Sequence, residues 1–223
     1  MKPDLLEFLS QFITENKKEK IEKVLEERTN FLTVVVEDIY QPHNASAVVR
    51  TCDCFGIQQL HVIENRNKYS VNPDVTLGSS KWVDIVKYNS AENNTSNCIS
   101  SLKSQGFTII ATTPHTNDIS LEDFELKGKT ALLFGNEKEG LSSEAISNAD
   151  GYVRVPMYGF TESLNISVTV AICLHHLSMK LRNQQEVDWR LSESEKNELY
   201  LKWIRGIIRN SHILEKEFAL GKH

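Results

Sequence analysis

The chain has 223 residues, of which 40% are hydrophobic and 25% are charged, with a formal net charge of −5. These values are typical of one well-filled globular domain with room for peripheral helices. No apolar stretch reaches the roughly 18 to 20 residues that a membrane helix needs, so we expect no membrane partner. Residues 1–30 carry charges throughout and lack the apolar run of a signal peptide, so we expect a cytoplasmic location.

The net charge and the cysteines bear on two possible kinds of partner, nucleic acids and metal ions. The acidic balance argues weakly against nucleic-acid binding, because phosphate contacts need Lys and Arg, although net charge does not say where the charges lie. No C-x-x-C pair and no Cys/His set with zinc-finger spacing occurs, so we expect no metal. We interpret the cysteines as reduced, partly buried thiols, at Cys52, Cys54, Cys98 and Cys173.

The predicted elements begin with a helix and continue as alternating strands and helices. Leu5, Leu9 and Ile13 recur at helical spacing and predict a helix over residues 3–28. Runs of β-branched and apolar residues then predict strands at 31–36, 60–63, 82–86, 107–111, 130–134 and 152–155. The intervening helices are predicted at 44–55, 91–105, 141–148 and 164–181, with a long polar loop at 65–81.

Strands that alternate with helices predict an α/β fold with a mostly parallel sheet flanked by helices. Residues 183–186 have the composition of a linker, and residues 192–220 are expected to form a final helical region that starts with a Ser192–Glu195 capping box. The expected organisation is therefore an N-terminal helical extension (1–30), a catalytic domain (31–182) and a C-terminal helical extension (183–223).

Three segments at predicted strand ends carry unusual polar residues. In the first, His43–Gly56, Asn44 stands where a helix N-cap would be, and Arg50 lies in an otherwise small and apolar helix. Taken alone, Arg50 is better interpreted as a surface residue. His43 and His115, near strand ends, are interpreted as exposed or structural histidines.

The second segment, Phe134–Ser142, is a polar turn bracketed by Gly135 and Gly140, which follows a buried strand. Glycines there allow close backbone approach to a ligand, although a simple turn would also explain them. The third segment, Val155–Val168, opens a long apolar helix with Ser163, Asn165 and Ser167. We expect Ser163 to cap that helix, but one cap does not explain three polar groups.

The three segments together read N-x5-R-x5-G, F-G-N-E-x-x-G-L and V-P-M-x-G-x-x-E-S-L-N-I-S-V. In order and spacing they resemble the signature motifs of the SpoU/TrmH methyltransferases of the SPOUT superfamily, over roughly residues 30–182. The resemblance implies S-adenosylmethionine as cofactor, a homodimer, and a C-terminal deep trefoil knot, which is a rare exception to the usual connection rules. It implies transfer of a methyl group to a ribose 2′-oxygen of RNA.

The resemblance also assigns roles to residues. Candidates for the cofactor slot are Thr113, Gly135, Val155 and Leu164, with Gly135 expected to leave room for the ligand. Candidates for the catalytic set are Arg50, Asn44, Glu137, Ser163 and Asn165. Arg50 is expected to contact the 2′-oxygen or an adjacent phosphate. A role as general base is less favoured, because a guanidinium stays protonated. Asn44 and Asn165 are expected to orient Arg50 or the RNA backbone, and Glu137 to organise its loop or pair with a cation.

The C-terminal region offers a candidate RNA surface. Basic residues recur at spacings of three and four, which would place them along one stripe of a single helix, at Lys202, Arg205, Arg209, His212 and Lys216. We hypothesise that Lys202, Arg205 and Arg209 contact RNA phosphates, although a solvated helix face would have the same pattern. Extensions around a single catalytic domain resemble the tRNA branch of the family, whose members methylate a D-loop guanosine.

Other functions remain open at this point. The same chemistry on rRNA is one alternative, and a non-catalytic RNA-binding module is another. The chain lacks G-x-G-x-x-G, the P-loop motif and G-x-S-x-G, so dinucleotide-binding, kinase and α/β-hydrolase interpretations lose their main support.

Overall fold

The computed structural model describes residues 5–114 and 118–221. It divides into two compact units. The larger unit is Thr29–Trp189, and the smaller one combines the chain up to Arg28 with the chain from Arg190 onward. No helix within the described ranges combines the length and the apolar character needed to cross a bilayer.

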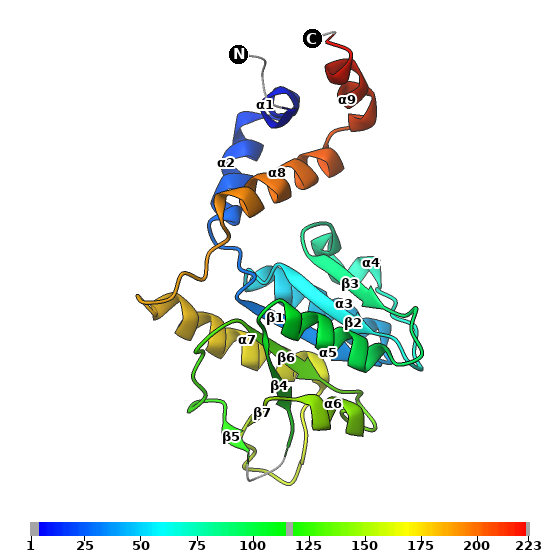
Figure 1. Ribbon diagram of the computed structural model, residues 1–223, viewed down its shortest axis with the longest axis vertical. Coiled ribbons are helices and arrows are strands. Elements are labelled where there is room, and N and C mark those ends of the chain that lie inside the picture. The colour runs from blue at the N-terminus through cyan, green and yellow to red at the C-terminus, as the bar shows by residue number, and fades with distance from the viewer. Residues whose placement is uncertain (1–4, 115–117, 222–223) are drawn as a thin grey trace. The chain divides into compact units, whose positions relative to one another are not determined.

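The larger unit is built on a sheet of seven strands, counted over the described residues, in the order β3-β2-β1-β6-β4-β7-β5 (Figure 1). Every strand pair in it is parallel. The strands are β1 (Leu32–Glu37), β2 (Gln59–Ile63), β3 (Asp84–Tyr88), β4 (Thr108–Thr112), β5 (Ile119–Ser120), β6 (Thr130–Phe134) and β7 (Gly151–Arg154). The predicted α/β class with a parallel sheet is confirmed.

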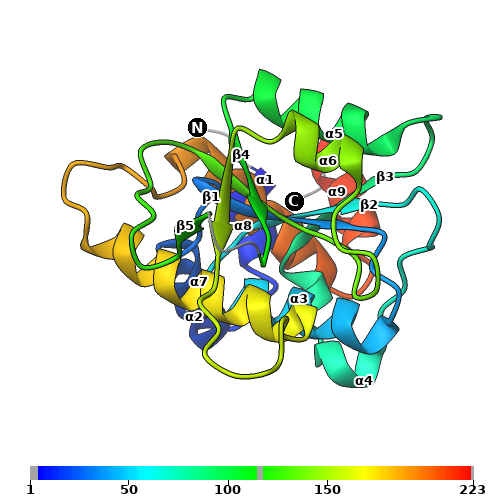
Figure 2. The ribbon, with the colours of Figure 1, turned by 90° about the horizontal axis from the view of Figure 1, so that it is seen from below.

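Helices cover both faces of this sheet (Figure 2). α3 (Pro42–Cys54) and α7 (Ile166–Asn183) pack against each other and against one face, while α5 (Asn94–Ser104) and α6 (Ser143–Asn148) cover the other. Side chains alternate along each strand, so Val34 of β1 belongs to the first core and Val35 to the second. Both faces of β1 are therefore buried, which explains its three consecutive valines, Val34–Val36.

The strand order reverses between β1 and β6, because β2 and β3 lie on one side of β1 and the later strands on the other. In parallel sheets, ligands bind beyond the carboxyl ends of the strands near such a reversal. The loops after β1 (from Asp38) and after β6 (from Gly135) leave the sheet at this place.

Some connections differ from expectation. The segment 65–81, predicted as a loop, contains the short helix α4 (Pro73–Thr76) and a 3-10 turn (Ser79–Lys81). Strand β5 has only two residues, which is too short to be predicted from hydrophobic periodicity. All four cysteines are free, and Cys54 is the exposed one.

The smaller unit consists of α1 (Leu5–Ser10), α2 (Glu15–Leu25), α8 (Glu193–Ile207) and α9 (Ser211–Ala219). The single N-terminal helix predicted over 3–28 is wrong, because the described chain leaves the helix between residues 11 and 14. The capping box at the start of α8 is confirmed: Glu195 N donates to Ser192 Oγ at 3.3 Å, and Ser192 N donates to Glu195 Oε2 at 2.8 Å.

Candidate active site

A cavity of about 390 Å³ lies at the carboxyl ends of β4, β6 and β7. Its volume is in the range of small-molecule sites, about 300 to 1,000 Å³. The cofactor candidates Thr113, Gly135, Val155 and Leu164 all line it. Its apolar wall also includes Phe134, Ile146, Val153 and Ile166. The sheet thus brings three separate strand ends and the start of α7 to one enclosure.

Gly135 is required for the closure of its own turn. A Cβ added there would overlap the Gly140 carbonyl group and the Leu141 amide nitrogen, well inside the 3.0 Å that real Cβ atoms keep. The turn closes on itself, since Asn136 and Gly140 exchange two backbone hydrogen bonds of 2.9 Å. The close neighbour of Gly135 is therefore its own loop. Gly135 also lines the cavity, so the expectation that glycine there leaves room for a ligand stays a prediction.

A chain of hydrogen bonds joins the three sequence motifs. Asn44 Nδ2 on α3 donates to Glu137 Oε1 at 2.8 Å, and Asn165 Nδ2 donates to Asn44 Oδ1 at 3.1 Å. Tyr40 N donates to Glu137 Oε2 at 3.2 Å. We call Asn44, Glu137 and Asn165 the motif relay. Both ends of the relay reach the cavity region, because Glu137 lines the cavity and Asn165 lies between the cavity residues Leu164 and Ile166.

Two predicted helix caps are wrong. α3 begins at Pro42 after Gln41, so Asn44 is inside the helix, where it is buried and free to bond across to Glu137. α7 begins at Ile166, and its N-cap is Asn165, whose Oδ1 accepts Ser167 N at 2.9 Å. Ser163 is an exposed cavity-lining residue in the preceding loop. Proline is common at the first helical position, and Asn and Ser are both common N-caps. The sequence alone therefore does not distinguish a start at Pro42 from one after Asn44, or a cap at Asn165 from one at Ser163.

The relay changes the acidity of Glu137. Partial burial alone would raise the pKa of this carboxyl. Hydrogen bonds from Asn44 and from the backbone of Tyr40 and Gln41 outweigh that effect and lower the pKa below its ordinary value. The carboxylate is therefore ionised and held in place at neutral pH.

Arg50 does not reach the cavity of its own chain. It is an exposed residue of α3, and α3 supplies none of the lining residues. Within the part of the chain that the structure describes, no hydrogen bond or ion pair is recorded for its guanidinium. Asn44 and Asn165 bond to Glu137 and to each other and have no recorded contact with Arg50. His43 is also exposed, and His115 lies outside the described residues.

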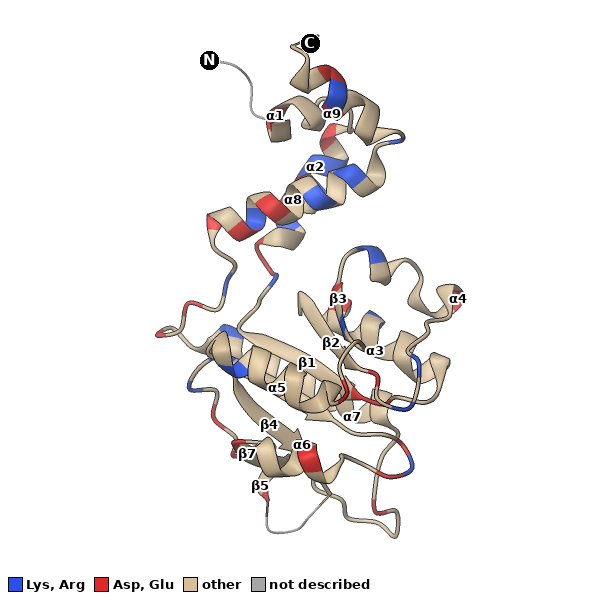
Figure 3. Ribbon diagram, turned by 45° about the vertical axis from the view of Figure 1, so that its right-hand side comes forward, with Lys and Arg blue, Asp and Glu red and all other residues tan. Residues whose placement is uncertain are grey.

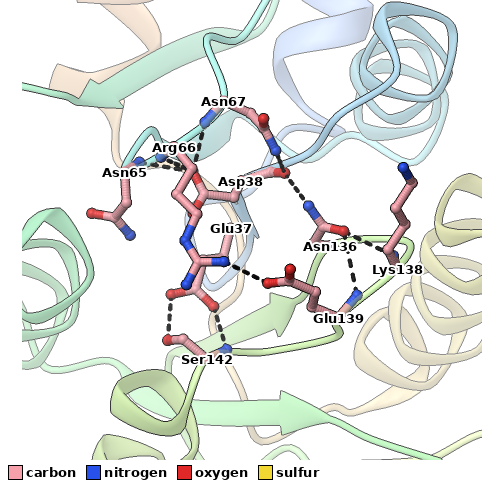
Figure 4. Close-up of polar contacts among 9 residues, drawn as sticks. All are labelled: Glu37, Asp38, Asn65, Arg66, Asn67, Asn136, Lys138, Glu139 and Ser142. Atoms are coloured by element: carbon pink, nitrogen blue, oxygen red, sulfur yellow. Dashed lines mark hydrogen bonds and ion pairs between the residues drawn. The ribbon is translucent and has the colours of Figure 1, made fainter.

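Sequence reasoning missed two acidic residues that shape the same loop, Glu37 and Asp38 at the end of β1. Both bond to the second motif or its flank, as Figure 4 shows. Their position could have indicated them, because Glu37 ends a buried strand and Asp38 follows it, at the edge where parallel strands end.

The predicted basic stripe is not one helix face. α8 ends at Ile207, and Asn210 adopts a left-handed conformation with φ of 60° before α9 starts. Arg205 is also paired with Glu215, with Nε and Nη2 donating at 2.9 and 3.0 Å. Lys and Arg residues do occur along α2 and α8 (Figure 3), and Arg209 lies exposed in the break between α8 and α9.

Comparisons with known proteins agree with this site. Residues 31–175 match the SpoU rRNA Methylase family. The tRNA (guanosine(18)-2′-O)-methyltransferase of Borreliella burgdorferi is 49% identical over 93% of each chain. The crystal structure of the Aquifex aeolicus TrmH/SpoU tRNA modifying enzyme superposes with a TM-score of 0.77 and 32% identity, over 88% of this chain and 98% of that one.

One more distant structure shares the fold. The SpoU methyltransferase AviRb from Streptomyces viridochromogenes, in complex with AdoMet, has a TM-score of 0.58 at 21% identity, over 73% of this chain and 62% of that one. A parallel sheet with a cavity at its carboxyl edge and three linked motifs defines a SpoU-type methyltransferase domain. The chain belongs to the SpoU methylase family.

Substituting Gly135 tests the closed turn. We expect Gly135→Ala to destabilise the protein by about 1 to 3 kcal/mol, because the added methyl group forces the backbone of residues 135–141 apart. Urea unfolding measures this loss. Gly128→Ala is the matched control, since a Cβ there meets no atom within 4 Å. Equal stability of the two variants would contradict the overlap.

Acidification tests the Glu137 carboxylate. Because its folded-state pKa is lowered, its contribution to stability is fully present above the ordinary value of 4.5 and is lost as pH falls through the lowered pKa. We expect the stability difference between the wild type and Glu137→Gln to shrink below pH 4.5. Thermal unfolding from pH 7 to pH 3 measures it, and a constant difference would exclude this linkage.

Proposed function

We propose that the protein transfers a methyl group from S-adenosylmethionine to the ribose 2′-hydroxyl of guanosine 18 in the D-loop of tRNA. The observation that supports this most directly is the motif relay beside a cavity of cofactor size. The substrate assignment is supported by the Borreliella burgdorferi relative, whose similarity extends over both terminal regions as well as the central unit.

The cavity residues fit S-adenosylmethionine. Val155, Leu164 and Ile166 offer an apolar wall to an adenine ring, while Thr113 and Ser163 add hydroxyl groups for the polar parts of the molecule. When bound, the cofactor supplies a methyl group activated by a positive sulfonium. The loop that follows Gly135 closes one side of the cavity, so its fixed shape determines how tightly the ligand can be held.

The remaining chemical task is to stabilise the 2′-oxygen of the RNA as it loses its proton. A guanidinium remains charged at neutral pH, so Arg50 is suited to stabilise negative charge on that oxygen or to hold an adjacent phosphate. In this proposal, the motif relay keeps the second-motif loop and the start of α7 in the geometry that accepts both substrates.

A homodimer accounts for the distance of Arg50 from its own cavity. Four apolar residues repeat along one side of α7 and its entry and are between 37% and 51% exposed: Leu164, Val168, Ile172 and Met179. Such a stripe favours burial against a second copy. Leu164 also lines the cavity, and α3 packs beside α7. An interface over this stripe would therefore place Arg50 of one copy near the cavity of the other.

The remaining structural expectations also belong to this proposal. We propose an extension–catalytic domain–extension organisation (1–30, 31–182 and 183–223), supported by the separate compactness of Thr29–Trp189. The trefoil knot is proposed from membership of the SpoU methylase family and from the superposition on the Aquifex aeolicus TrmH/SpoU enzyme. A tRNA substrate implies a cytoplasmic location.

RNA phosphates are proposed to bind the smaller unit through Lys202 and Arg209, with Arg205 in a lesser role. The ion pair with Glu215 already satisfies the Arg205 guanidinium. Arg209 lies in the break between two helices and lines a groove with Lys17. Two cations at one groove suit a negatively charged backbone.

The function is tested by mapping 2′-O-methylation in tRNA and rRNA from cells with and without the gene. We expect loss of the mark at tRNA guanosine 18 alone, and its restoration in vitro by the purified protein with S-adenosylmethionine. Arg50→Ala should lower the rate at least about 100-fold while cofactor binding persists, because charge stabilisation at the reacting oxygen is lost. Unchanged tRNA marks in the deletion strain would overturn the proposal.

Mixed dimers test which chain supplies Arg50. Arg50→Ala and the cavity-filling variant Val155→Trp should each be inactive alone. If Arg50 serves the partner's cavity, co-refolded mixtures regain roughly a quarter of wild-type activity, since half of the dimers are mixed and each has one intact site. A mixture without activity would show that Arg50 serves its own chain.

Charge reversal tests the RNA surface. Arg209→Glu should weaken tRNA binding and reduce the slope of log affinity against log salt by about one. Arg205→Glu is the matched comparison and should change binding less, because its charge is already paired. Filter binding at several salt concentrations measures both. Equal effects of the two variants would remove the special role of Arg209.

A further inference from the structure

Asp38 stands at a backbone position that ordinary residues avoid. Its φ is +50°, in the left-handed region, which costs a non-glycine residue free energy unless its surroundings over-determine it. The compensation is visible in Figure 4: Oδ1 accepts the backbone N–H groups of Asn65 and Arg66 at 2.8 Å and of Asn67 at 3.2 Å. One carboxylate thus fixes the first residues of the long segment that follows β2.

The carbonyl group of Asp38 faces the second motif. Its oxygen accepts Asn136 Nδ2 at 2.9 Å and Asn67 Nδ2 at 2.8 Å. The other side of the Asn136 amide is used inside the loop, where Oδ1 accepts Lys138 N at 2.8 Å. The left-handed turn at Asp38 is therefore what aims a carbonyl at the residue that shapes the loop 136–140.

Glu37 holds the other end of the same loop. It is 2% exposed, and its Oε2 accepts Ser142 N at 2.8 Å. Oε1 accepts Ser142 Oγ at 2.7 Å and Thr95 Oγ1 at 2.6 Å. A buried carboxylate with three hydrogen-bond donors is stably accommodated. Two consecutive residues of β1 and its turn thus hold both ends of the segment from Asn136 to Ser142.

That segment is a common wall between two hollows. Residues 136–141 line the proposed cofactor cavity on one side. On the other side all of these residues except Glu137 border a groove of about 860 Å³ that contains Glu37 and Asp38. Neither carboxylate lines the cofactor cavity, so neither can touch the reacting atoms.

An exposed ion pair also spans the groove, between Arg66 Nη1 and Glu139 Oε2 at 2.6 Å. Both side chains are about 70% exposed (73% and 69%), and such pairs contribute little in water. The hydrogen bonds of Glu37 and Asp38 must therefore restrict the loop more than this ion pair does.

We infer that Glu37 and Asp38 are positioning residues for the methyl-transfer reaction, which set the shape of the cofactor-binding loop from behind. This inference rests on the proposed function. It assigns a role to the end of β1, which lies outside the three sequence motifs. It also explains why an acidic residue stands at a left-handed position where glycine would meet no steric cost.

The test separates cofactor affinity from turnover. Asp38→Ala should raise Kd and KM for S-adenosylmethionine about tenfold or more, from the loss of hydrogen bonds to a charged group, while kcat at saturating cofactor falls less. Asp38→Asn tolerates the same backbone and keeps one acceptor oxygen, so it should stay within about threefold of the wild type. Asp38→Gly removes the side-chain hydrogen bonds but accepts the left-handed backbone without strain. It should resemble Asp38→Ala, because the hydrogen bonds and not the backbone strain are expected to matter.

Hydrogen exchange supplies a readout that global destabilisation would not reproduce. In Asp38→Ala, the amides of residues 138–142 should exchange faster while those of β1 and β6 keep their protection. If Asp38→Ala does not fold, Glu37→Gln addresses the other end of the loop, with the same expected rise in KM. Glu92→Ala is the matched control, because this exposed carboxylate lines the same groove and has no recorded bond to the loop.

The outcomes distinguish the two proposals. If the wild-type protein fails to bind S-adenosylmethionine in calorimetry, the proposed function fails. If the wild type binds it and Asp38→Ala and Glu37→Gln bind it equally well, this inference is overturned. A fall in kcat with unchanged KM would also overturn it, because the carboxylates would then act on the chemical step.

Discussion

The hydrogen bond from Asn44 to Glu137 is the contact on which the arrangement of the site depends. It joins α3 to the loop after β6, two segments 93 residues apart in the sequence, at 2.8 Å. Asn165 extends the connection to the start of α7. Because an amide both donates and accepts, Asn44 can bond to a carboxylate on one side and to a second amide on the other. An aspartate at this position would place two carboxylates together.

The cavity loop is constrained from two directions. The motif relay holds it from the side of α3 and α7. Glu37 and Asp38, at the end of β1, hold it from the side of the groove. Gly135 allows the turn to close, because no side chain could fit between residues 135 and 140. A loop that is fixed at both ends before the ligand arrives has less conformational freedom to lose on binding, and this favours affinity.

Much of the larger unit could be predicted from the sequence, because both-face burial makes β1 and β6 continuous apolar runs and glycines follow several helices. Periodicity could not locate β5, which has two residues, or the break between α8 and α9, where the basic spacing continues across a change of direction. The motif residues were identified by resemblance, but their partners were not. Nothing in the local pattern says that Asn44 bonds to Glu137, or that Asp38 turns its carbonyl toward Asn136, since these contacts depend on strand order.

The composition of the smaller unit has a consequence for synthesis. α1 and α2 come from the start of the chain, and they pack against α8 and α9 from its end. On the ribosome, the apolar faces of the first two helices must therefore wait until α8 and α9 have emerged, after the whole of the larger unit. During that interval Phe8, Leu9 and Ile21, which are buried in the finished unit, lack their permanent neighbours. During the synthesis of the larger unit, the first two helices are therefore accessible to chaperones.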